Sequence, residues 1–115
     1  MAELDLKERQ AGDVTILDLT GEVRIGEGSI ALRDSIRQLA DQGKHKVLLN
    51  LAGVKYMDSS GVGELIANYT TLKRAGGQLK LLKLTDRIQN LLVITKLLTV
   101  FDSFEDEAEA LKSFG

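Results

Sequence analysis

An aspartate followed by two serines is the clearest candidate for chemistry in this sequence. Asp58, Ser59 and Ser60 stand between an apolar run, 46–51, and a segment with helical spacing that begins near Val62. At a helix N-terminus the backbone N–H groups are unpaired and the helix dipole is positive. Two interpretations follow: the side chains cap the helix, or one hydroxyl accepts a phosphate of about −1.5 to −2 charge. A phosphate there would change partner binding with little refolding.

A serine nucleophile would need a base, and the sequence offers a poor one. The only histidine, His45, precedes the run 46–51, whereas Ser59 and Ser60 follow its far end. A strand of that length, at about 3.3 Å per residue, separates them by roughly 20 Å. Neither serine stands in a G-x-S-x-G pattern. We therefore expect a binding protein and not an enzyme.

The sequence also lacks the residues that a metal site or a nucleotide-binding site would need. The chain has no cysteine, one histidine and no EF-hand spacing, so we expect no metal. The glycine pairs at 26–28 and 61–63 are too short for a dinucleotide fingerprint, and no P-loop lysine follows, so we expect no cofactor. A formal net charge of −2 argues against nucleic-acid binding. The charged N-terminus and the short apolar runs predict no signal peptide and no membrane span, hence a soluble cytoplasmic protein.

The pattern of the chain predicts an α/β fold. With 115 residues and a hydrophobic fraction of 43%, we expect one domain, 1–115, with a mainly aliphatic core. Strands are expected at 4–9, 14–20, 46–51, 78–84 and, briefly, 100–101. Helices are expected to begin at Ser29, after Asp58, at Thr85 or Asp86, and at Ser103; Gly43 should end the first of them. The order β-β-α-β-α-β-α-(β)-α implies a partly parallel sheet with helices beside it.

The segment 56–63 resembles the phosphorylation motif of bacterial anti-sigma factor antagonists, which are STAS-domain proteins. The similarity extends to a strand end at 19–22, the run 46–51, the turn at 75–79 and the segment 91–101, and so covers nearly the whole chain. It implies a single STAS-like α/β domain, with a mixed sheet of about four or five strands and about four helices.

The resemblance also implies a mechanism for a phosphoprotein that regulates transcription. The unphosphorylated antagonist binds an anti-sigma factor, which is also an ATP-dependent serine kinase, and so releases the sigma factor. The kinase modifies the first serine after the aspartate, here Ser59, with Ser60 as the second candidate, and a metal-dependent serine phosphatase reverses the step. ATP and metal thus belong to the partners. The alternative is a STAS scaffold or regulatory subunit outside sigma control, such as a stressosome-like or lipid-transport partner.

Around Ser59 we expect a surface that contacts the kinase. Asp58 should cap the helix, and Gly61 and Gly63 either let the kinase approach the backbone or pack the turn. Many relatives carry an aspartate where this chain has Arg24, so either the kinase is atypical or the loop contacts it differently. We expect a monomer or weak dimer. The predicted partner-contacting residues are Glu22, Arg24, Tyr56, Met57, Asp58, Ser60, Gly61, Val62 and Gly63, of which Tyr56, Met57 and Val62 would form an apolar rim unless Val62 belongs to the core.

Overall fold

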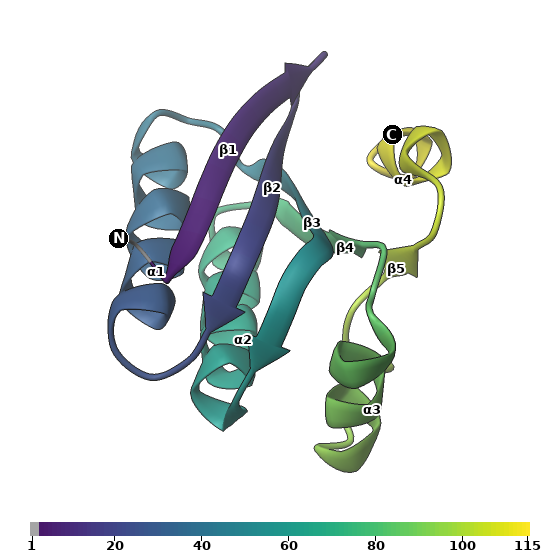
Figure 1. The fold of residues 1–115 in the computed structure, drawn as a ribbon. Coiled ribbons are helices and arrows are strands. Elements are labelled where there is room, and N and C mark those ends of the chain that lie inside the picture. The colour runs from purple at the N-terminus through teal and green to yellow at the C-terminus, as the bar shows by residue number, and fades with distance from the viewer. Residues whose placement is uncertain (1–2) are drawn as a thin grey trace.

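A mixed five-stranded sheet forms the centre of the protein (Figure 1). The computed structural model describes residues 3–115; Met1 and Ala2, part of the predicted domain 1–115, lie outside the described residues. The strands are β1 (Leu4–Ala11), β2 (Val14–Val23), β3 (Lys46–Met57), β4 (Gln78–Leu82) and β5 (Ser103–Phe104). They lie in chain order; β1 is antiparallel to β2, and the other neighbours are parallel. The predicted α/β class and element order are confirmed.

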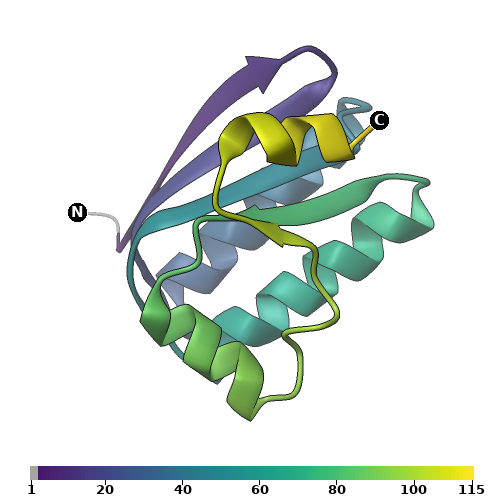
Figure 2. The ribbon, with the colours of Figure 1, turned by 90° about the vertical axis from the view of Figure 1, so that its right-hand side faces the viewer.

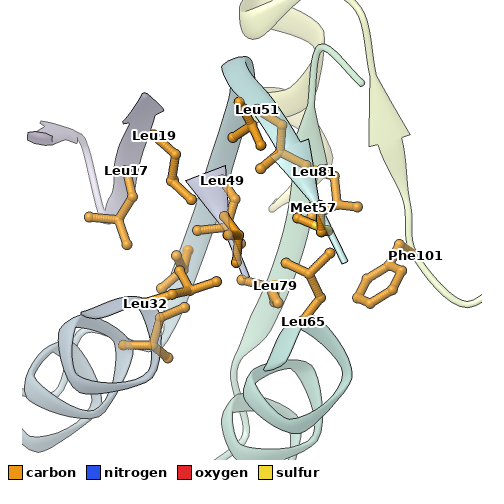
Figure 3. Packing of buried hydrophobic residues seen from close by; sticks show 14 of the residues in the cluster. Leu17, Leu19, Leu32, Leu49, Leu51, Met57, Leu65, Leu79, Leu81 and Phe101 are labelled. Carbon is orange, nitrogen blue, oxygen red and sulfur yellow. The ribbon is translucent and has the colours of Figure 1, made fainter. Parts of the chain in front are cut away.

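The helices divide between the two faces of the sheet. They are α1 (Glu27–Asp41), α2 (Ser59–Arg74), α3 (Asp86–Ile94) and α4 (Glu107–Ser113). Figure 2 shows α4 in front of the sheet and α1 and α2 behind it. Because side chains alternate along a strand, Leu48 packs with α4 while Leu49 joins the larger cluster on the other face (Figure 3). Ile88 and Leu92 anchor α3 in that larger cluster.

The predicted end of α1 and the predicted cap of α3 are confirmed. After α1, Gly43 has a φ of +78° and donates to the Ala40 carbonyl oxygen, and the Lys44 N–H donates to the Leu39 carbonyl oxygen. This is a Schellman motif, which satisfies carbonyl groups that the helix end would leave unpaired. At the start of α3, the Thr85 hydroxyl accepts from the Ile88 N–H at 3.2 Å, which confirms Thr85 as the cap.

Three strands run further than the sequence predicts: β1 ends at Ala11 and not at Arg9, and β2 and β3 extend toward the site. β2 continues through Gly21 to Val23, and β3 continues beyond the apolar run to Met57, because their ends pair with each other. The register shifts between Gly21 and Glu22, where Gly21 has a φ of +119°, so this glycine bends the strand without ending it. As a result, β2 and β3 end beside the predicted site.

Several predicted boundaries were wrong. Ser29 does not cap α1, because the helix already begins at Glu27 and the Ser29 side chain is buried within it. β4 ends at Leu82 and not at residue 84, because Lys83 adopts a left-handed φ of +56°.

The strand and the helix start predicted near the C-terminus were also wrong in position. Phe101 is not in a strand; it is buried with its ring edge-on to Tyr69, at a centroid distance of 5.4 Å. The capping residue of α4 is Asp106 and not Ser103, which lies in β5. The Asp106 carboxylate accepts from the Glu109 N–H at 3.1 Å, so the acidic side chain takes the role expected of the serine.

Candidate functional site

Asp58 fixes the junction between β3 and α2. The strand ends at Met57, and α2 begins at Ser59, so Asp58 alone makes the turn. Its Oδ1 accepts from the Gly61 N–H at 3.0 Å, and its Oδ2 accepts from the Ile25 N–H at 3.0 Å. The predicted cap is present, and the same carboxylate also holds the loop that leads into α1.

These contacts favour the ionised form of Asp58. Partial burial raises the pKa of the Asp58 carboxyl, but hydrogen bonds from the backbone N–H groups of Ile25, Gly61 and Ser60 lower it. The nearby positive charge of Arg24 lowers the pKa further, and the net result lies below the usual value of 3.8. The junction between β3 and α2, called the corner below, therefore carries a fixed negative charge at neutral pH.

Ser59 lies at the first position of α2 with its side chain exposed, whereas Ser60 is half-buried. Ser59 borders an open groove of about 560 Å³ between the end of β3 and α3. The residues that line this groove are Tyr56, Met57, Asp58, Ser59, Arg87, Asn90, Leu91 and Ile94. His45 lies at the opposite end of β3, where its Nε2 is 3.2 Å from the Ala40 carbonyl oxygen, and so cannot serve Ser59 as a base.

The loop after β2 lies against the corner, as the family resemblance implied for Arg24. Arg24 forms an ion pair of 3.1 Å with Glu22, and its guanidinium carbon lies 4.6 Å from the centroid of the Tyr56 ring. The Asp58 N–H donates to the Val23 carbonyl oxygen at 3.3 Å. Glu22 is paired with Tyr56 across the sheet, so the structure brings these two predicted contact residues together.

The apolar residues of the motif differ in their positions. Tyr56 is half-buried at the groove, whereas Met57 and Val62 are each only 3% exposed and belong to the core. Figure 3 shows Met57 among the core side chains. The expected rim must be corrected accordingly: of the three side chains, Tyr56 alone offers substantial surface to a partner. Met57 and Val62 pack in the core beneath Asp58 and Ser59 and stabilise the corner.

The two glycines of the motif also differ. A methyl group at Gly61 would lie 2.5 Å from the Val23 carbonyl oxygen and 2.6 Å from the Met57 Cγ, so Gly61 serves the packing of α2 on the sheet. At Gly63 a methyl group would meet no atom within 4 Å beyond its chain neighbours and the adjacent backbone of α2. A partner can therefore approach the backbone closely at Gly63 but not at Gly61.

Arg87 and Asn90 are the polar groove residues that the sequence did not reveal. Both lie on α3, and the Arg87 guanidinium carbon is 5.5 Å from the centroid of the Tyr56 ring. A helix pattern at 86–94 predicts a helix but not the element beside which it packs. The buried contacts of Ile88 and Leu92 hold α3 in the larger cluster, and in this position the helix lines the groove beside Ser59.

Residues 3–115 contain neither a cluster of candidate metal ligands nor a helix that could span a membrane. In this range no three His, Asp or Glu side chains gather closely enough to hold a metal ion. No helix of the described chain is long and apolar enough to cross a bilayer.

Comparisons with known proteins agree with the geometry. The model of the STAS domain matches residues 5–110. An anti-sigma-B factor antagonist of Bacillus subtilis (strain 168) is 32% identical over 99 residues, covering 86% of this chain and 87% of that protein. The crystal structure of a putative anti-sigma factor antagonist from Thermotoga maritima has a TM-score of 0.84 at 20% identity and covers 95% of this chain and 93% of its own. Bacillus SpoIIAA, solved in a phosphorylated form, has a TM-score of 0.74 at 21% identity, with 95% and 98% covered. Both solved proteins share this fold.

Proposed function

Because this chain belongs to the STAS domain family, we propose that it is an anti-sigma factor antagonist controlled by phosphorylation of Ser59. The unphosphorylated form binds an anti-sigma factor that is also a serine kinase and thereby frees the sigma factor. Phosphorylation of Ser59 ends this binding, and a serine phosphatase restores it. The chain is the substrate of these partners and not itself an enzyme.

The observation that carries the proposal is the division of roles between Asp58 and Ser59. Asp58 caps α2 through its Oδ1, so the Ser59 hydroxyl is not needed as the cap. The Ser59 side chain is exposed at the edge of a groove of about 560 Å³. A kinase can therefore reach the hydroxyl without unfolding the helix, whereas half-buried Ser60 is less accessible.

The same corner accounts for a switch that needs little refolding. The N-terminal N–H groups and the dipole of α2 tolerate a phosphate. The phosphate would stand next to the ionised Asp58, so the negative charge of the surface would rise sharply. An acidic partner surface would then be repelled, and an apolar one would have to desolvate the phosphate on binding. Tyr56, Arg24 with Glu22, and the open backbone at Gly63 are the contacts that we propose for the unphosphorylated complex.

The test is phosphorylation by the candidate anti-sigma factor kinase. The purified chain is incubated with that kinase, ATP and Mg²⁺, and its intact mass and modified residue are determined by mass spectrometry. We expect one phosphate, on Ser59, and none on the Ser59→Ala variant. A chain that takes up no phosphate and forms no complex with the kinase would instead act as a STAS scaffold or regulatory subunit outside sigma control. Modification of Ser60 alone would also contradict the proposed site.

A further inference from the structure

We propose that Arg87 of α3 binds the phosphate carried by Ser59 and so closes the groove between the end of β3 and α3. The inference rests on the proposed phosphorylation and adds to it an intramolecular receptor for the phosphate. The switch would then change the shape of the groove as well as its charge.

The position of Arg87 is the first argument. Arg87 and Ser59 line the same groove from two helices that are separated in sequence. The Arg87 guanidinium carbon lies 5.5 Å from the centroid of the Tyr56 ring, which belongs to the end of β3 just before the corner. An exposed cation–π contact is weak, so it can keep the side chain near the groove and still release it to a stronger partner.

The availability of its charge is the second argument. Among residues 3–115, Arg87 forms no ion pair, whereas the other arginine at the Tyr56 ring, Arg24, is already paired with Glu22 at 3.1 Å. Both oxygens of Asp58 accept backbone hydrogen bonds. Arg87 is therefore the positive group best able to pair with a new anion in the groove, and a guanidinium can bind phosphate through two parallel hydrogen bonds.

The rest of the wall that α3 forms supports the same assignment. Asn90 lies one turn after Arg87 on α3 and also lines the groove, where its side-chain amide can donate a further hydrogen bond. Leu91 and Ile94 complete this wall, and Ile94 is 75% exposed. Drawing Arg87 toward Ser59 would cover part of this apolar wall and remove it from a partner.

The test uses a chain in which phosphoserine is incorporated at position 59 during translation. Its phosphate is titrated by ³¹P NMR, alone and with Arg87→Gln, Arg87→Lys or Arg74→Gln. Arg74 is an exposed arginine at the far end of α2 and controls for the loss of one positive charge. We expect the second phosphate pKa to be about 0.5 to 1 unit higher with Arg87→Gln than in the parent, because a nearby cation favours the dianion. With Arg87→Lys the second phosphate pKa should lie between those of the parent and Arg87→Gln. With Arg74→Gln it should equal that of the parent.

Equal titration of the parent and Arg87→Gln would overturn the inference, as would an equally large shift with Arg74→Gln. Because the phosphoserine is installed without any kinase, the result does not depend on the proposed partner. A kinase that ignores Ser59 would sink the proposed function and leave the measured contact intact. Conversely, the absence of an Arg87 effect in a chain that the kinase does modify would sink this inference alone.

Discussion

The Asp58 carboxylate accepts a 3.0 Å hydrogen bond from the backbone N–H of Ile25, a residue 33 positions earlier in the chain. Its other oxygen caps α2 at Gly61. One side chain thus fixes both the helix that carries Ser59 and the loop that carries Arg24. The orientation of the loop and the start of the helix are coupled through this carboxylate.

We therefore expect Asp58→Ala to lower the free energy of unfolding by about 1 to 2 kcal/mol, because it removes the cap and the loop contact together. Asp34→Ala, at an exposed position in α1, is the matched control and should change it by less than about 0.5 kcal/mol. Urea unfolding followed by circular dichroism measures both. Equal stability of the two variants would show that the carboxylate does not hold the corner.

The lowered pKa of Asp58 predicts how this contribution depends on pH. The folded pKa lies below the usual value of 3.8, so ionised Asp58 stabilises the fold fully above that value and progressively less as the pH falls through the folded pKa. The stability difference between the parent and Asp58→Asn should thus shrink below about pH 4. Asp13 and Asp18 also have lowered pKa values, but they are common to both proteins and cancel in the difference. A difference that stays constant from pH 7 to pH 2.5 would contradict the prediction.

Local signals predicted more of this fold than pairing between distant segments did. The capping contacts of Asp58, Thr85 and Gly43 reach only a few residues along the chain, so these roles could be predicted from spacing, whereas the hydrogen bond from Ile25 to Asp58 could not. The extension of β3 to Met57 could not, because it depends on β2 as its partner. Arg87 was not predicted as a site residue because its position beside Tyr56 depends on how α3 packs against the sheet. No local sequence pattern indicates that packing.

Ser59 is expected to set the affinity for the anti-sigma factor through its charge. Ser59→Ala should bind the kinase as tightly as the unmodified chain and stay bound in the presence of ATP. Ser59→Asp should bind at least about tenfold more weakly, which corresponds to about 1.4 kcal/mol. Pull-downs and titration calorimetry with the cognate anti-sigma factor test this pair. Equal affinity of the two variants would remove the basis for a charge switch.

Arg24 is expected to affect partner choice more than stability. Its ion pair with Glu22 and its stacking on Tyr56 are at the surface, so Arg24→Asp should cost less than about 1 kcal/mol in folding. Reversal of the charge beside Ser59 should nevertheless weaken kinase binding by about tenfold or more. Arg37→Asp, on an exposed part of α1, controls for net charge. If both variants bind the kinase as the parent does, the loop lies outside the interface.

Gly61 and Gly63 provide a matched pair, because one is enclosed and the other is open. Alanine at position 61 would place its methyl group 2.5 Å from the Val23 carbonyl oxygen, so we expect a loss of about 1 to 3 kcal/mol in the free energy of unfolding. Alanine at position 63 meets no atom within 4 Å beyond its chain neighbours and the adjacent backbone of α2, and it should stabilise α2 by up to about 1 kcal/mol. Because Gly63→Ala remains folded, its affinity for the kinase tests close approach to the backbone. We expect weaker binding by this variant, and unchanged binding would move the contact away from Gly63.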